Sequence, residues 1–175
     1  GTILLNACPA KPYLSQTSKP ALDALVCTSS PLDLAECSES IERLRNRFYQ
    51  SWLLKRLVRQ TLTDPFGISP SLKDSLANSA SKLTIRGFDA LVTAPRWGYK
   101  DVESYYLGAS PLKKILGSYN SLPPTLFLQA LYDPWVPSYG AVHLAREIES
   151  KQENKLDFVL TQKGGHNGFH SQEGC

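Results

Sequence analysis

The chain has 175 residues, and its 19 Lys and Arg against 16 Asp and Glu give a formal net charge of +3. This length suits about one domain with its own core, and the 42% of apolar residues is ordinary for a globular protein. So small a charge gives no support to nucleic-acid binding. No apolar run reaches the roughly 18 residues of a membrane-spanning helix.

The four cysteines show no C-x-x-C spacing, so we expect neither a zinc site nor a disulfide framework. Cys27 lies inside an apolar run and is predicted to be a buried free thiol. So few cysteines favour a reducing compartment, with the cytoplasm first, although a membrane surface or a plastid stays open. The other three are Cys8, Cys37 and Cys175.

The sequence contains no Met and opens on an apolar segment, Gly1–Leu5, that reads as the middle of an element. We therefore expect an internal piece of a longer protein. Residues 1–8 are predicted to form a buried helix, which Pro9 and Pro12 break, and a polar loop is expected over 15–19.

Three short apolar runs predict strands, and the first of them, residues 24–28, is nearly continuous. Such a run is typical of a strand that is buried on both faces of a parallel sheet. The second run covers 125–131, and the third begins at Leu156 and stops at Gly164. A helix predicted over 139–151 separates these two runs. This alternation predicts an α/β fold with a mostly parallel sheet and helices on both faces.

Between the first two strands, one long helix is predicted from about Leu34 to Leu62, with an apolar stripe and a basic opposite face. A basic amphipathic helix could lie on a membrane surface, although a simply solvated charged face is the more common outcome. A shorter helix is expected over 69–86. The aromatic-rich segment over 86–110 is expected to be irregular, and it could line a pocket or anchor a long connection. The stripe is Ile41, Leu44, Phe48, Trp52, Leu53 and Leu57, and the basic face carries Arg43, Arg45, Arg47, Lys55, Arg56 and Arg59.

Two polar residues follow predicted strands directly: Asp133 after the second and His166, in a glycine-rich turn, after the third. Taken alone, His166 could be a structural residue beside a hairpin, and Asp133-Pro134 an ordinary turn. In an open parallel sheet, however, functional groups collect at the carboxyl ends of the strands. The Asp133 carboxylate could then accept a hydrogen bond from one imidazole nitrogen and fix the tautomer of His166.

In this order the motifs resemble the α/β-hydrolases, and most closely the YheT-type branch of esterases. The resemblance spans most of the chain, from about Ala24 to Phe169. Its pieces are Ser30–Leu34, Arg47–Gln50 with Leu53 and Leu54, Phe88-Asp89, Thr93-Ala94, Gly98-Tyr99, Tyr105-Tyr106 with Ser110, Tyr132–Pro134, and Gly164–His166 with Gly168-Phe169.

The resemblance implies a hydrolase core over 1–33 and 111–175 and a helical cap over 34–110 that covers the active site. Asp133 matches the acid and His166 the general base of a catalytic triad. Asp33 is the second choice for the acid, because some α/β-hydrolases carry it after the sixth strand. The implied reaction is hydrolysis of medium-chain acyl esters or glycerolipids through an acyl-enzyme, without metal or organic cofactor. Acyl transfer to an alcohol is the close alternative.

The nucleophile of the family sits in a G-x-S-x-G motif, and this sequence contains none. Gly1 would be the last glycine of that motif, so the nucleophile is expected upstream and the chain alone is expected to be inactive. The alternative is a non-catalytic remnant that acts as a binding module. Ser69, Ser79, Ser110 and Ser118 lie in the wrong context for a nucleophile, and His143 and His170 are expected to lie outside the site.

Overall fold

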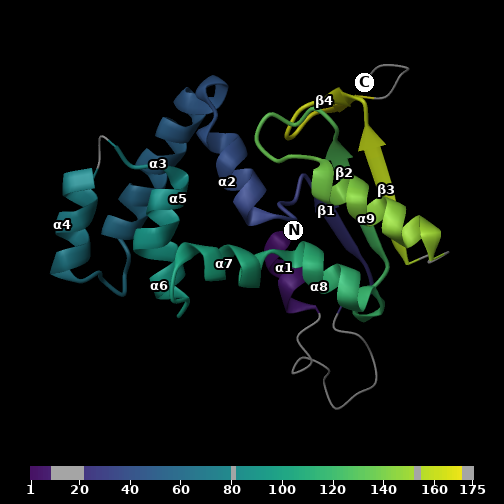
Figure 1. Ribbon diagram of the computed structural model, residues 1–175, viewed down its shortest axis with the longest axis horizontal. Helices are drawn as coiled ribbons and strands as arrows, with labels where there is room; N and C mark the ends of the chain where they lie inside the picture. The colour runs from purple at the N-terminus through teal and green to yellow at the C-terminus, as the bar shows by residue number, and fades with distance from the viewer. Residues whose placement is uncertain (9–21, 80–81, 152–154, 171–175) are drawn as a thin grey trace, which may run out of the picture. The chain divides into compact units, whose positions relative to one another are not determined.

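The computed structural model describes residues 1–8, 22–79, 82–151 and 155–170. Two compact units divide the chain: unit 1 combines Gly1–Cys37 with Ala109–Cys175, and unit 2 is Ser38–Gly108 (Figure 1). The breaks predicted at Pro9 and Pro12, the loop over 15–19 and Cys175 lie outside the described residues.

Unit 1 is built on a three-stranded parallel sheet in the order β1-β2-β3, which confirms the predicted α/β fold with a parallel sheet. The strands are β1 (Leu25–Thr28), β2 (Thr125–Ala130) and β3 (Leu156–Thr161). β2 is the central strand and pairs with both neighbours. The carboxyl ends of all three strands therefore meet at one edge of the sheet.

One face of this sheet carries the core of unit 1, formed with α1 (Thr2–Ala7), α8 (Pro111–Ser118) and α9 (Tyr139–Ser150). On the sheet side, Phe127 stacks on Phe158 with 4.9 Å between ring centroids. The helices contribute fully buried side chains, and such burial is the main stabilising term of a small domain. These include Leu5, Ile115 and Leu144.

The opposite face of the sheet is less covered. Val26 and Val159 point to that side and are 60% and 46% exposed. The prediction that the first strand is buried on both faces is therefore wrong for the described chain. The physical reason is that α1, α8 and α9 all contribute to the core on the other side of the sheet.

Helix α8 was not predicted, although its start carries a recognisable signal. Pro111 occupies the first turn of the helix. Proline has no N–H, and the N–H groups of the first turn have no partner within the helix, so no hydrogen bond of the helix is lost. A short 3-10 turn, η4 (Tyr119–Ser121), follows it and leads into β2.

Unit 2 is helical, and its elements depart from the sequence prediction in three places. The helix predicted over 69–86 ends at Ser79, and the next helix begins at Ile85. The single helix predicted over 34–62 is broken at Arg43, whose ψ of 144° is extended, so α2 and α3 are separate helices. The segment over 86–110, predicted to be irregular, is mostly helical and includes a π-helical turn. The elements are α2 (Leu34–Glu42, shared with unit 1), η2 (Leu44–Asn46), α3 (Arg47–Leu62), α4 (Pro70–Ser79), α5 (Ile85–Phe88), η3 (Asp89–Thr93), α6 (Ala94–Arg96) and α7 (Val102–Ala109).

The Asp89 carboxylate ties α7 to η3 inside unit 2. It accepts hydrogen bonds from Tyr106 Oη at 2.8 Å and from Thr93 Oγ1 at 2.6 Å. Burial raises the pKa of Asp89, and burial also raises the pKa of Tyr106. These residues of the sequence motifs therefore anchor the segment rather than line an open pocket.

In the part of the chain that the structure describes, no helix combines the length and the apolar character that a bilayer span requires.

Candidate catalytic site

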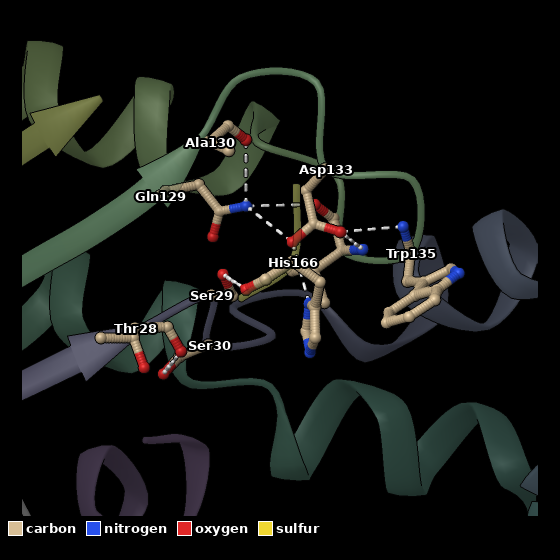
Figure 2. A network of polar contacts seen from close by, with 9 residues as sticks. Thr28, Ser29, Ser30, Gln129, Ala130, Asp133, Trp135 and His166 are labelled. Atoms are coloured by element: carbon tan, nitrogen blue, oxygen red, sulfur yellow. Dashed lines mark hydrogen bonds and ion pairs between the residues drawn. The ribbon is translucent and has the colours of Figure 1, made fainter. Parts of the chain in front are cut away.

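The turn after β2 holds the Asp133 carboxylate in a fixed position. Its Oδ1 accepts the backbone N–H groups of Trp135 at 2.9 Å and Val136 at 3.0 Å. The buried amide of Gln129 lies 3.4 Å from Oδ2 and also donates to the Val136 carbonyl oxygen at 3.2 Å (Figure 2). The carboxylate side chain is fully buried. These donors fix the orientation of the carboxylate and leave Oδ2 directed to receive one more N–H.

His166 lies in the loop of a small antiparallel hairpin of β4 (Lys163–Gly164) and β5 (Phe169–His170). Gly164 has a φ of +119°, and a Cβ there would lie 2.0 Å from the carbonyl oxygen of Gly168. Only glycine fits this position. The turn is therefore a hairpin, and this hairpin carries the histidine to the edge of the sheet.

The structure brings Asp133 and His166 together, with 2.9 Å between Oδ2 and Nδ1 (Figure 2). β2 and β3 are neighbours, so the turns that follow them meet. An ionised carboxylate accepts only from Nδ1–H, and in the neutral ring this leaves the lone pair on Nε2, the nitrogen that faces away from Asp133. The His166 side chain is 26% exposed and could take a proton from a bound group. The Trp135 ring packs against the imidazole with 5.1 Å between centroids.

Ser29, at the end of β1, is a further residue of the site that the sequence did not reveal. Its hydroxyl donates to the backbone carbonyl oxygen of His166 at 2.5 Å, and the residue is 4% exposed. Its φ of 42° is the one positive φ of a non-glycine residue in the described chain. Backbone strain of this kind clusters at functional sites, so Ser29 is a further candidate residue of this site. The only signal in the sequence was a serine directly after a predicted strand.

Asp33, the second candidate for the acid, has a different role in the structure. Its Oδ1 accepts the N–H of Glu36 at 3.1 Å, three residues into α2. This is the geometry of an N-terminal helix cap. The structure therefore favours Asp133 over Asp33 as the partner of the imidazole.

Among the described residues of unit 1, neither Ser110 nor Ser118 forms a hydrogen bond with His166. Ser110 Oγ accepts the N–H of Leu34 at 2.9 Å, and Ser69 Oγ accepts the N–H of Leu72 at 3.2 Å, so both satisfy helix starts. Ser79 and Ser118 end α4 and α8. His143 stacks on Tyr139 within α9.

The described thiols are also poor nucleophiles. Cys8, Cys27 and Cys37 are free, and Cys27 is buried as predicted. Burial, followed by the charge of Asp33, raises the pKa of Cys37 to about 12. Burial raises the pKa of Cys27 as well. Among the described residues, no group of three or more His, Cys, Asp or Glu side chains gathers where it could hold a metal ion.

Comparison with known proteins gives relatives by sequence, while no protein-family model and no solved structure matches the chain. Escherichia coli YheT, whose name proposes an esterase, is 32% identical over 152 residues, which are 85% of this chain and 41% of the relative. The monoacylglycerol lipase of Saccharomyces cerevisiae is 32% identical over 165 residues, covering 90% of this chain and 34% of the lipase. Mouse phospholipase ABHD3 is 32% identical over 173 residues, covering 97% and 38%. The chain thus spans less than half the length of these relatives.

Proposed function

The chain belongs to the α/β-hydrolase superfamily, and we propose that it supplies the acid, Asp133, and the general base, His166, of a serine ester hydrolase that acts on lipid esters. The observation that carries this proposal is the 2.9 Å contact between a buried carboxylate and a partly exposed imidazole. The relatives are named as an esterase, a lipase and a phospholipase, which supports an ester of a lipid as the substrate class.

In the proposed reaction, a serine hydroxyl attacks the ester carbonyl while Nε2 of His166 takes its proton. Asp133 stays ionised, holds the imidazole in the Nδ1–H tautomer and stabilises the imidazolium. The imidazolium then gives the proton to the leaving alcohol, which completes the acyl-enzyme. A water molecule attacks the acyl-enzyme with His166 again as base, which releases the carboxylic acid and the free serine.

The nucleophile is proposed to lie outside these 175 residues, in a G-x-S-x-G motif whose last glycine is Gly1. The chain itself contains no such motif and matches 34–41% of its relatives' length. In support, a Cβ on Gly1 would lie 1.6 Å from Ser30 Oγ, so this position accepts no side chain. A crowded position of this kind suits a glycine in the sharp strand-to-helix turn of the nucleophile elbow.

Unit 2 is proposed to be the cap that shapes the acyl pocket. Its residues, Ser38–Gly108, are inserted in the sequence between the two segments of unit 1. This is where the resemblance places a cap, over 34–110. Medium-chain acyl esters and glycerolipids are the proposed substrates, and transfer to an alcohol would use the same acyl-enzyme.

The test uses the gene product that includes the coding region before Gly1, with p-nitrophenyl esters of short and medium acyl chains. We expect turnover that falls by roughly 10⁴-fold in His166→Ala and is unchanged in the control His143→Ala. The 175-residue chain alone is expected to show none. Turnover that survives His166→Ala, or a start codon directly before Gly1 in place of a G-x-S-x-G motif, would contradict the proposal. The second outcome would favour a non-catalytic remnant.

A further inference from the structure

The solvent side of α3 carries apolar and basic side chains together. Phe48, Trp52, Lys55, Arg59 and Leu62 follow one another at spacings of four, three, four and three, which places them on one side of the helix. All five are exposed, with Phe48 at 79% and Trp52 at 53%. We call these five residues the α3 face.

The α3 face is not needed for the core of unit 2. Leu53 and Leu57 pack against that core, whereas Leu44, Phe48 and Trp52 do not. The single apolar stripe predicted from the sequence is therefore wrong. Residues four apart drift by about 40° per step around a helix, and Leu53 lies about 100° from Trp52. The predicted apolar residues therefore divide into a group that packs on the core and a group that is exposed.

The charged side chains of α3 itself are all positive. Helix α3 contains Arg47, Lys55, Arg56 and Arg59 and no Asp or Glu. None of these four cations forms an ion pair with a carboxylate in the described part of the chain. Two of them lie on the exposed aromatic rings instead, with Arg56 5.1 Å from the ring centre of Trp52 and Arg47 5.0 Å from that of Phe48. Exposed aromatic rings beside unpaired guanidinium groups suit an interface that is part apolar and part anionic.

A groove of about 530 Å³ runs beside the α3 face. Leu54, Val58 and Leu83 give it an apolar lining, and Lys55 and Arg59 belong both to the groove and to the face. Its size is in the range of ligand sites. Apolar lining next to cations suits an amphiphile, with the hydrocarbon in the groove and an anionic head group on the cations.

We propose that the α3 face docks unit 2 onto an anionic lipid surface. Phe48, Trp52 and Leu62 enter the boundary between head groups and acyl chains, while Lys55 and Arg59 bind phosphate oxygens. Charge complementarity favours an anionic lipid surface as the partner, because the helix has four cations and no acid. This inference rests on the surface of unit 2 alone, so it stands or fails separately from the proposed hydrolysis.

The charge is tested by co-sedimentation of the 175-residue chain with vesicles of phosphatidylcholine alone or with added phosphatidylserine. We expect binding only to the phosphatidylserine vesicles, weakened by salt. The double variant Lys55→Glu/Arg59→Glu is expected to lose roughly 30-fold in affinity or more, since each basic residue contributes about fivefold. The control Lys73→Glu/Lys100→Glu makes the same change of charge at exposed positions elsewhere in unit 2 and is expected to change affinity by less than about threefold.

The apolar contribution is tested with Phe48→Ser/Trp52→Ser against Trp97→Ser, which removes a 71% exposed tryptophan from another part of unit 2. We expect the first variant to lose most of its vesicle binding and the second to keep it, with circular dichroism unchanged in both. The proposal is overturned if the wild-type chain does not bind phosphatidylserine vesicles, if it binds only a soluble fatty acid, or if the control variants weaken binding as much as the α3-face variants.

Discussion

The turns that follow β1 and β2 look alike in the sequence, yet they hold different parts of one histidine. Each carries a proline and an aspartate after a strand of the parallel sheet. In the β2 turn, Asp133 accepts a hydrogen bond from the imidazole of His166. In the β1 turn, Ser29 donates to the backbone carbonyl oxygen of His166, and Asp33 caps α2. The orientation of the ring and the position of the main chain are thus set by separate strands.

The difference between the two aspartates follows from strand order. β2 lies directly beside β3, so the residue that leaves β2 meets the hairpin that follows β3. β1 is one strand further away, and its aspartate comes five residues after the strand end, where α2 already begins. Similar local patterns therefore acquire different roles through their neighbours in the sheet.

The largest expected effect is that of Asp133→Asn in the gene product that carries the nucleophile. Asparagine keeps the shape and still accepts the N–H groups of Trp135 and Val136 through its oxygen, but its amide favours the wrong imidazole tautomer. We expect kcat to fall by roughly 10⁴-fold, measured by steady-state ester hydrolysis. If Asp33→Asn inactivated the enzyme while Asp133→Asn stayed within tenfold of wild type, the acid would belong to the β1 turn instead.

An intermediate effect is expected from Ser29→Gly. Glycine adopts the positive φ without strain and removes the hydroxyl that holds the His166 carbonyl, so thermal stability should be kept while the hairpin loosens. Misplacement of a catalytic group costs roughly 10- to 100-fold, and we expect such a fall in kcat with little change in KM.

Two further variants sharpen the role of Ser29. Ser29→Asn tolerates a positive φ and can donate from its amide, so it should recover part of the lost kcat. The control Ser150→Ala removes an exposed hydroxyl that donates to the Glu147 carbonyl oxygen at 2.8 Å at the end of α9, and it should leave kcat unchanged. Full activity in Ser29→Gly would show that the contact with His166 does not position the base.

The smallest expected effect on activity is that of Asp33→Ala. Loss of an N-terminal cap costs about 1 kcal/mol, so the free energy of unfolding should fall by that amount in urea titrations while kcat stays within twofold. Asp33→Asn should lose less, because asparagine caps nearly as well. A tenfold loss of kcat in Asp33→Ala would mean that the β1 turn does more than hold a helix start.

The Asp133–His166 pair could be predicted because it depends on rules that act over short distances. Parallel strands end at one edge of a sheet, and both residues follow strands whose apolar runs are clear in the sequence. Ser29 could not be found in this way, since neither its positive φ nor the path of the hairpin over β1 leaves a local pattern.

The helices over 86–110 in unit 2 were missed for a different reason. Gly87, Pro95 and Gly98 read as breakers, yet two of them fall where a helix tolerates them. Thr84 Oγ1 accepts the Gly87 N–H at 3.1 Å and so caps α5, and Pro95 occupies the first turn of α6. The apolar residues of α3 also divide into a side that packs on the core and a side that is exposed. The sequence does not distinguish these two sides, because tertiary packing decides which of them meets the core.

The most direct measurement is the tautomer of His166, read from imidazole ¹⁵N chemical shifts of the 175-residue chain at a pH where the ring is neutral. Because the buried Asp133 carboxylate accepts from Nδ1, we expect His166 as the Nδ1–H tautomer with Nε2 unprotonated, and we expect Asp133→Asn to abolish this preference. A predominant Nε2–H tautomer in the wild-type chain, or one that is the same in Asp133→Asn, would show that Asp133 does not prepare His166 to act as a base.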